Sequence, residues 1–209
     1  MARIAIIGTG NMATGLGTGW ARAGNEVVFG SRDPLAASVK LAGVPGAKFA
    51  REAAALAGAE VVVLAIPYPS VAAFAQANAT ALRGKVVIDI SNPFDHLPDN
   101  RLAGAEITAR AIGEGARVVA AFKANFAGTL LKPTLEQEGR KVQRDALFAG
   151  DDGPAKAVVA GLIGALGMRP VDCGSLHNAR IIDGMVSLII EVDGRVAGGK
   201  HQSVWNLVG

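Results

Sequence analysis

The sequence predicts an α/β fold with a doubly wound, mostly parallel β-sheet, and two observations lead to this prediction. First, apolar runs of strand length recur along the chain with helical stretches between them, which is typical of crossover units on a parallel sheet. These runs lie at residues 4–7, 27–29, 61–66, 86–90, 118–122, 146–149 and 169–172. Second, the run at 61–66 is apolar throughout, as expected of a strand that helices cover on both faces.

The first helix is predicted between the first two strands, and Gly24 ends it. One side of this helix is apolar at a spacing of 3.6 residues, which suits packing on the sheet. That side carries Met12, Ala13, Leu16 and Trp20.

Two later helices are predicted from their start and stop residues. A helix over 155–166 has Asp152 as its N-cap, Pro154 in its first turn and Gly167 just beyond its end. A final helix over 179–193 has Asn178 as a candidate cap. Its apolar face either covers the sheet or pairs with a second subunit. That face carries Ile182, Met185, Ile189 and Val192.

Composition excludes several classes of protein. Of the 209 residues 50% are hydrophobic and only 19% charged, which excludes a disordered chain. Aromatic residues make up 5% and the net charge is +3, so little surface is available for stacking on bases or attracting phosphate polymers. We therefore expect no nucleic-acid partner.

Membrane insertion, secretion and metal binding are not expected either. The longest strongly apolar run, 61–66, is far shorter than the roughly 18 residues of a membrane span. Gly8 interrupts the first apolar stretch too early for a signal peptide, so a cytoplasmic location is expected. The one Cys and three His lack the spacing of a metal site.

The strongest motif runs from Gly8 through Thr9, Gly10, Asn11 and Met12 to Ala13, directly after the first strand and at the start of the first helix. Gly8 permits a tight turn, Gly10 lets the backbone approach a pyrophosphate, and Ala13 allows helix and strand to pack closely. The free amides of the helix start face the anion. The motif predicts a Rossmann-like dinucleotide site.

The end of the second strand indicates which dinucleotide binds. An acidic residue about 20 positions after the motif would bind the ribose hydroxyl of NAD, but Ser31 and Arg32 stand there instead. A hydroxyl and a guanidinium suit a 2′-phosphate, so NADP is favoured over NAD. Asp33, followed by Pro34, is interpreted as the cap of the next helix.

Other turns at the carboxyl ends of strands are predicted to surround the nicotinamide, since ligands of such sheets bind at that edge. The candidates are Ala65, Ile66, Pro67 and the following Tyr68 and Pro69, then Asn92, Ala124, Asn125 and the turn at 173–176. Asp89 is interpreted either as part of this ring or as a partner of backbone amides. Lys123 has two interpretations: it protonates a carbonyl or imine substrate, or its side chain points to solvent.

With these motifs in hand, the chain resembles the NADPH-dependent reductases of coenzyme F420, a family also related to the NADPH domain of ferric reductases. The resemblance is carried by residues 7–12, 30–32, 65–67, 89–93, 121–125, 148–152 and 171–176. It implies that NADP lies across Thr9 to Met12, Ser31 and Arg32, Ile66 and Pro67, and Asn92. It also implies that the deazaflavin ring lies near Ala124 and Asn125. Hydride passes directly between two stacked rings, so no residue is assigned a catalytic acid or base role.

The leading hypothesis is therefore an NADP(H)-dependent oxidoreductase that transfers hydride between NADPH and a flavin-like cofactor. Coenzyme F420 is the first candidate, with FMN or FAD next. One alternative is a reductase of a small imine or keto acid, although relatives of that kind carry a large helical second domain and only residues 173–209 follow the last predicted strand. Another alternative is a non-catalytic NADP sensor.

We expect one dinucleotide-binding domain over 1–172, with a C-terminal helix and tail over 173–209 that pack on it. The resemblance alone suggests a homodimer.

Overall fold

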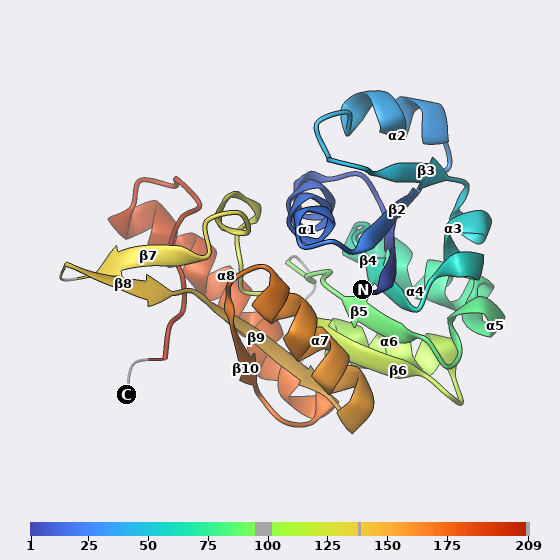
Figure 1. The fold of residues 1–209 in the computed structure, drawn as a ribbon. Coiled ribbons are helices and arrows are strands. Elements are labelled where there is room, and N and C mark those ends of the chain that lie inside the picture. The colour runs from blue at the N-terminus through green and yellow to red at the C-terminus, as the bar shows by residue number, and fades with distance from the viewer. Residues whose placement is uncertain (95–101, 138, 208–209) are drawn as a thin grey trace.

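The computed structural model describes residues 1–94, 102–137 and 139–207. In these ranges the chain alternates strands and helices around one large sheet, with a small hairpin beside it (Figure 1). The strands are β1 (Arg3–Ile7), β2 (Glu26–Gly30), β3 (Lys48–Ala50), β4 (Val61–Leu64), β5 (Val86–Asp89), β6 (Arg117–Ala121), β7 (Thr134–Gln137), β8 (Arg140–Gln143), β9 (Asp145–Gly150) and β10 (Arg169–Asp172). The helices are α1 (Asn11–Arg22), α2 (Pro34–Lys40), α3 (Glu52–Gly58), α4 (Tyr68–Ala77), α5 (Ala79–Leu82), α6 (Gly104–Ile112), α7 (Gly153–Ala165) and α8 (Ala179–Val196), with 3₁₀ helices η1 (Ala127–Thr129) and η2 (Leu176–Asn178).

The large sheet confirms the predicted doubly wound α/β fold. Its strand order is β10-β9-β6-β5-β4-β1-β2-β3. All neighbours pair in parallel except β6 and β9, which are antiparallel with Ala120 opposite Ala149. From β1 the chain winds outward through β2 and β3, whereas from β4 it winds the other way. The direction of winding therefore reverses between β1 and β4, and the carboxyl ends of these two strands flank the usual ligand crevice of such a sheet.

Each of the seven predicted apolar runs overlaps a strand, but three runs extend too far. The strands β4, β5 and β6 end at Leu64, Asp89 and Ala121. Ala65, Ile66, Ile90 and Phe122 therefore belong to turns, although their apolar side chains continue the pattern of the strand.

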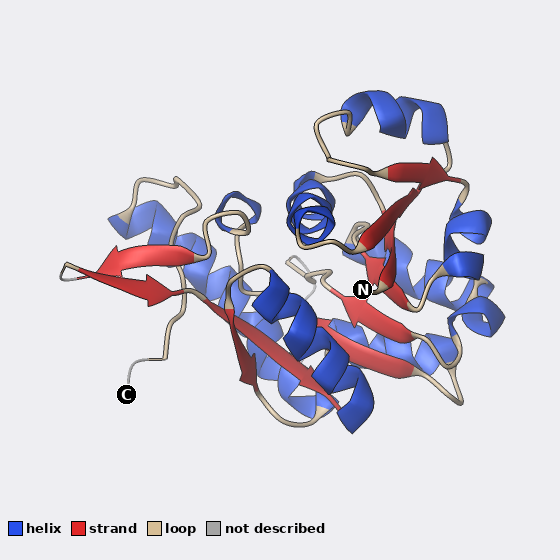
Figure 2. Ribbon diagram, viewed as in Figure 1, coloured by secondary structure: helices blue, strands red, loops and turns tan. Residues whose placement is uncertain are grey.

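Helices cover both faces of the large sheet, as Figure 2 shows. On one face, Leu16 and Trp20 of α1 and Val159 of α7 are buried in the same cluster as Ile4 and Ile6 of β1. The Trp20 indole Nε1 donates to the Leu162 carbonyl oxygen at 2.9 Å, which joins α1 to α7. The helices α3, α4, α6 and α8 contribute to the second cluster, on the other face.

The predicted apolar side of α1 and the predicted N-cap of α7 are both found. Ala13, Leu16 and Trp20 are buried in α1, and Met12 is half-buried. The Asp152 carboxylate accepts from the Ala155 amide at 2.7 Å, so Asp152 caps α7 as predicted.

The predicted cap of the last helix is wrong. The Asn178 side chain makes no capping bond to α8, and its Nδ2 donates to the Cys173 carbonyl oxygen at 2.6 Å. η2 continues directly into α8, so Asn178 already has helical backbone angles and its side chain stabilises the preceding turn.

The predicted apolar face of α8 covers the body of the protein. Ile182 and Ile189 are buried, while Met185 and Val192 are half-buried. Another side of the helix exposes Ile181 and Leu188. Among the described residues, no helix has both the length and the apolar character needed to cross a lipid bilayer.

Candidate functional site

A cavity of about 670 Å³ opens at the carboxyl edge of the sheet, where the winding direction reverses. Turns from β1, β2, β4 and β5 form its wall, together with the start of α3. The lining residues are Gly8, Thr9, Gly10, Asn11, Met12, Gly30, Ser31, Arg32, Glu52, Ala65, Ile66, Pro67, Tyr68, Pro69, Ile90, Ser91, Asn92, Pro93 and Phe94. A volume of this size is typical of small-molecule and cofactor sites.

Gly8 and Gly10 shape the turn after β1 in different ways. Gly8 has a φ of +115°, and a Cβ atom there would lie 2.3 Å from the Ala65 carbonyl oxygen, so only glycine fits between β1 and β4. Gly10 stands at the N-cap of α1 with an extended backbone, and a Cβ there would meet nothing within 4 Å. The open space beside Gly10 is where a ligand can approach the backbone.

The start of α1 has the properties of an anion site. No side chain caps it and its first turn holds no acidic residue. Its first amides therefore keep their partial positive charge toward the cavity, which favours a phosphate group. The geometry at the start of α1 therefore supports a dinucleotide site, as the glycine motif does.

The corner after β2 brings Ser31 and Arg32 to the cavity. The Ser31 hydroxyl accepts from the Asp33 amide at 3.1 Å and donates to the Asp33 carbonyl oxygen at 3.0 Å, which makes a tight turn. Asp33 caps α2 by accepting from the Ala36 amide at 3.0 Å, as predicted. None of the carboxylates in the described ranges forms an ion pair with Arg32.

Of two further lining residues, Glu52 and Tyr68, only Tyr68 was among the candidates from the sequence. Glu52 follows β3, a three-residue strand that the sequence pattern did not predict, so no signal pointed to it. Tyr68 is the first residue of α4, directly after the turn that follows β4. Burial raises the pKa of the Tyr68 phenol, and the Asp183 carboxylate raises it further.

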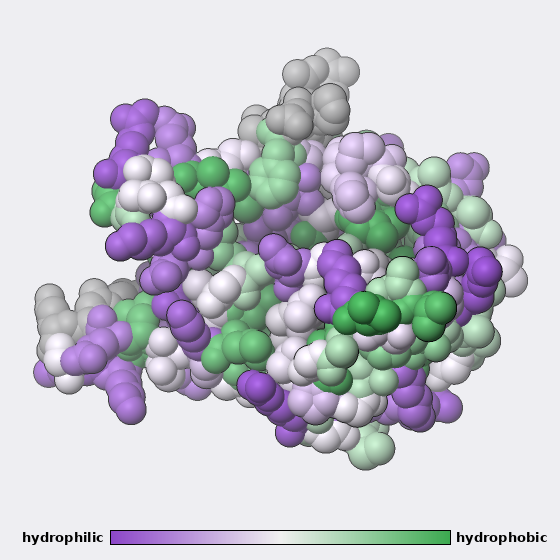
Figure 3. Space-filling model, turned by 90° about the horizontal axis from the view of Figure 1, so that it is seen from above, coloured by the Kyte–Doolittle hydropathy of each residue, from purple (hydrophilic) through white to green (hydrophobic). Residues whose placement is uncertain are grey.

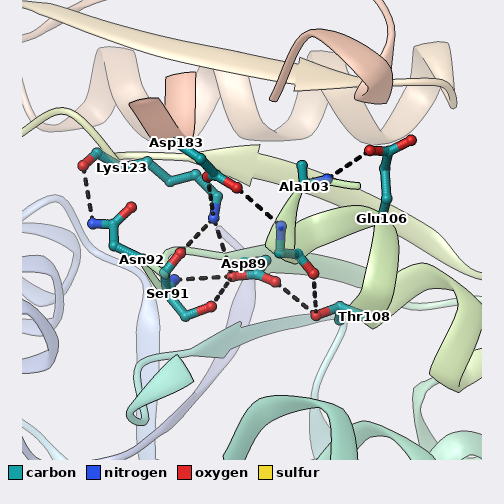
Figure 4. Close-up of polar contacts among 9 residues, drawn as sticks. Asp89, Ser91, Asn92, Ala103, Glu106, Thr108, Lys123 and Asp183 are labelled. Carbon is teal, nitrogen blue, oxygen red and sulfur yellow. Dashed lines mark hydrogen bonds and ion pairs between the residues drawn. The ribbon is translucent and has the colours of Figure 1, made fainter. Parts of the chain in front are cut away.

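The turn after β5 is held by Asp89, which is fully buried. Its carboxylate accepts from the Ser91 amide at 2.9 Å, the Ser91 hydroxyl at 2.7 Å and the Thr108 hydroxyl at 2.7 Å (Figure 4). Of the two interpretations of Asp89, the structure supports the one in which it satisfies the groups of its own turn. Ser91 and Asn92 then line the cavity.

Lys123 neither points to solvent nor lines the cavity. Its side chain is completely buried, and its ammonium lies 2.9 Å from an Asp183 carboxylate oxygen and 3.7 Å from one of Asp89. It also donates to the Ser91 carbonyl oxygen. The preceding Phe122 has a φ of +57°, so the chain turns inward after β6, and the lysine is enclosed instead of following the strand direction to the edge.

Ala124 and Asn125 do not reach the wall of this cavity. Ala124 is buried, and the Asn125 Nδ2 donates to the Asp145 carbonyl oxygen at 2.9 Å. The turn at 173–176 is also absent from the lining. In the strand order β5 stands between β6 and the crevice of β1 and β4. β9 and β10 run antiparallel to β6, so the turn after β10 leaves the sheet in the opposite direction from the turns that line the cavity. Contact of Ala124 and Asn125 with a second ring therefore stays a prediction.

The two described histidines and the cysteine do not line the cavity. His96 lies outside the described residues. His177 is exposed, and the His201 ring packs edge-on against Phe126 with centroids 5.0 Å apart. Burial raises the pKa of the Cys173 thiol, which disfavours its reactive thiolate form.

Comparison with known proteins relates the chain to one family. The family described as coenzyme F420-dependent NADP oxidoreductase matches residues 3–93. The F420-dependent NADP reductase of Methanothermobacter thermautotrophicus is 34% identical over 211 residues, covering 91% of this chain and 89% of the relative.

Two further relatives extend the comparison. A solved structure from Arthrobacter sp. FB24, provisionally named an F420-dependent NADP reductase, matches with a TM-score of 0.85 and 30% identity, covering 100% of both chains. The metalloreductase STEAP3 of Rattus norvegicus is 31% identical over 186 residues, which cover 87% of this chain but 36% of that protein. The similarity to the Methanothermobacter and Arthrobacter proteins therefore extends beyond residues 3–93, and the similarity to the Arthrobacter structure includes α8.

Proposed function

We propose, from the premise that this chain belongs to the family of coenzyme F420-dependent NADP oxidoreductases, that it transfers hydride between NADPH and coenzyme F420. The chain is an oxidoreductase of NADP, and F420 is the acceptor or donor that its relatives are named for. FMN and FAD are the next candidates for the second cofactor.

One observation carries this proposal. A single cavity joins the uncapped start of α1 to the Ser31 and Arg32 corner. The first feature suits a pyrophosphate and the second a 2′-phosphate, and together they match the two anionic parts of NADP. The open space beside Gly10 fits a ligand that approaches the backbone closely.

The roles of the lining residues follow from this placement. Thr9 to Met12 bind the pyrophosphate, and Ser31 with Arg32 bind the 2′-phosphate. Because the adenosine end then lies toward β2, the nicotinamide end lies toward β4 and β5, between Ala65 to Pro67 and Asn92. NADPH supplies the hydride itself, so the protein has to align the two rings and exclude water.

The imine or keto reductase alternative loses the residue on which it depended. Lys123 was its one proton donor, and the buried ammonium is instead held by Asp89, Asp183 and Ser91. No feature of the described residues specifically favours the alternative of a non-catalytic NADP sensor. The experiment below tests that alternative.

Three narrower expectations belong to this proposal. We infer a cytoplasmic location, a single domain in which 173–209 pack on 1–172, and a homodimer. The exposed Ile181 and Leu188 on α8 give the pairing a candidate surface. Light scattering after size exclusion measures the oligomeric state, and a monomer at all concentrations would exclude the dimer.

The experiment that tests the function follows NADPH absorbance with purified protein and each acceptor: F420, FMN and FAD. We expect turnover with F420. Binding of NADPH without oxidation by any acceptor would indicate a sensor, and no binding would remove the proposal entirely.

The 2′-phosphate assignment has its own test in Arg32→Ala. Hydrogen bonds to a charged group contribute about 1.5–3 kcal/mol, so NADPH should bind roughly 10 to 100 times more weakly. NADH lacks the phosphate and should lose little. Equal losses for the two dinucleotides would show that Arg32 has another role.

A further inference from the structure

Lys123, Asp89, Asp183 and Ser91 form a buried group of contacts, here called the Lys123 cluster. Ser91 of this cluster lines the cavity at the end of β5. Four separate elements meet at the lysine: the ends of β5 and β6, the start of α6, and α8. Asp183 of α8 accepts from the Gly104 amide at 2.9 Å through its second oxygen (Figure 4). The ammonium thus contacts the carboxylates of Asp183 and Asp89 and the Ser91 carbonyl oxygen.

Contacts in both directions couple this cluster to the Ser91 and Asn92 turn. The Lys123 ammonium donates a hydrogen bond to the Ser91 carbonyl oxygen, and the Asn92 Nδ2 donates to the Lys123 carbonyl oxygen at 3.1 Å. Both Ser91 and Asn92 line the cavity, whereas Lys123 does not. Removing the ammonium would leave the Ser91 carbonyl and two buried carboxylates without their cation.

Tyr68 connects the cluster to the cavity by a second route. A Cβ at Gly104 would lie 3.0 Å from Tyr68 Cε2 and 3.6 Å from Lys123 Nζ, so the tyrosine ring and the ammonium both approach the same glycine. Tyr68 lines the cavity, and the charges of Asp183, Lys123 and Asp89 all act on its phenol. The strained backbone of Phe122 beside the lysine is of the kind that persists where the surroundings determine the geometry.

We propose that Lys123 is a positioning residue for the nicotinamide end of the bound dinucleotide, acting through the Ser91 and Asn92 turn and through Tyr68. The proposal rests on the proposed function, because that function places the nicotinamide toward β4 and β5. The adenosine end, at the Ser31 corner, lies outside the reach of these contacts.

The test compares two ligands of one site in the paired variant Lys123→Met with Asp183→Asn. This variant removes one charge of each sign, so the net charge of the cluster does not change, and it leaves an amide oxygen for the Gly104 amide. The Asp89 carboxylate loses its cation but keeps its hydrogen bonds from Ser91 and Thr108. We expect NADPH to bind about tenfold more weakly. We expect 2′,5′-ADP, which carries only the adenosine half, to bind as in the wild type.

Each outcome decides a different question. Unchanged affinities for both NADPH and 2′,5′-ADP would overturn the positioning role. Equal losses for both would overturn it too, and would show that the cluster has only a structural role. Failure of the wild type to bind NADPH would instead remove the proposed function. The single variant Asp183→Asn keeps the comparison available if the paired variant does not fold.

A control uses an ion pair that joins the buried carboxylate of Asp145 to the exposed side chain of Arg169. The Asp145 carboxylate is buried and accepts from Arg169 at 2.6 and 2.8 Å, away from the cavity. The paired change Arg169→Met with Asp145→Asn should affect stability without changing the ratio of the two affinities. A shift in the ratio there would mean that general loosening explains the Lys123 result.

A second, independent observation concerns positive charge at the 2′-phosphate corner. Residues 35–39 of α2 carry no charge, and Leu35 and Val39 are exposed, which gives the hydrophobic surface seen over α2 in Figure 3. Lys40 stands only in the last turn. Glu52 lines the same cavity and its Cα lies beside Gly30, so it adds a negative charge to this end of the site that a second cation would offset.

Arg51 supplies a second guanidinium from the adjacent strand end. Its Nη1 donates to the Arg32 carbonyl oxygen at 2.9 Å, and the Ser31 amide donates to the Ala50 carbonyl oxygen at 3.0 Å. Within the described ranges no carboxylate forms an ion pair with Arg51. We infer that Arg51 is a specificity-determining residue that favours NADP over NAD at this corner.

Arg51→Gln tests this inference, with Lys40→Gln as the control that removes the same charge. We expect Arg51→Gln to weaken NADPH about tenfold and leave NADH unchanged. We expect Lys40→Gln to change neither. An unchanged NADPH affinity in Arg51→Gln would overturn the inference, as would an equal loss for NADH.

Discussion

Gly8 and Gly10 stand two residues apart, but a methyl group would meet different surroundings at each. At Gly8 it would collide with the Ala65 carbonyl and require a left-handed backbone, so Gly8→Ala should lower the free energy of unfolding by about 1–3 kcal/mol or more. At Gly10 it would enter open space, so Gly10→Ala should fold normally and bind NADPH less tightly. Chemical denaturation and a fluorescence titration measure the two effects.

The two variants serve as controls for each other. Equal stabilities would show that the turn relaxes around Gly8. Undiminished NADPH binding in Gly10→Ala would show that the dinucleotide does not approach the backbone there.

At the level of residues, the sequence was informative where side chains act locally. Asp33 and Asp152 were predicted as caps because a cap requires only its own few neighbours. Lys123 could not be assigned, because its partners Asp89 and Asp183 are brought to it by other elements. Arg51 was missed for the same reason, since its contact with Arg32 depends on the pairing of β2 with β3.

At the level of elements, seven strands were predicted from the sequence, and β3, β7 and β8 were missed. β3 has only three residues, and the hairpin of β7 and β8 carries mostly exposed polar side chains, so neither produces an apolar pattern. The ends of β4, β5 and β6 were placed too far along because the apolar pattern continues into the turns. The turns after β4 and β5 line the cavity, whereas the turn after β6 does not. The sequence therefore indicated most of the cavity wall although it misplaced these strand ends.

The tail after α8 is tied to the helix by one carboxylate. Asp193 accepts from the amides of His201, Gln202 and Ser203 at 2.7 to 3.0 Å. The hydrogen bond from the Ser203 side chain, and then those from the three amides, hold the pKa of Asp193 well below its ordinary value.

This arrangement predicts a pH-dependent contribution to stability. Because the folded pKa lies below the unfolded value of about 3.9, the contribution is complete above roughly pH 5 and is lost as the pH falls toward the folded pKa. Asp193→Asn should therefore be less stable than the wild type at pH 7, and the difference should narrow below about pH 4. Urea unfolding at both pH values measures this.

Glu191→Gln is the matched control on the same helix. Glu191 pairs with Arg195 at an exposed position, where ion pairs contribute little. Its variant should resemble the wild type at both pH values. A constant difference between Asp193→Asn and the wild type from pH 7 to pH 3 would contradict the predicted role of the carboxylate.

At the level of the whole molecule, the C-terminal segment is joined to the rest of the fold at several points. Asp183 of α8 bonds the start of α6 and the lysine after β6, and Ile182 lies in the same cluster as residues of β1 and β4. The Leu207 amide donates to Asp145 of β9 at 2.7 Å. Elements connected in this way should unfold together, because losing one leaves buried polar groups of the others unpaired.

Calorimetry with and without ligand tests this cooperativity. We expect one transition whose calorimetric and van't Hoff enthalpies agree. NADPH at 100 times its dissociation constant adds about 2.7 kcal/mol to the free energy of unfolding, which should raise the Tm of a chain of this length by about 5–11 °C. The whole transition should move, because the cavity is built from turns of the central strands while α8 holds one of its walls through Lys123. Two transitions, of which only one responds to NADPH, would show that the C-terminal segment unfolds independently and that its contacts with α6 and β6 do not stabilise the site.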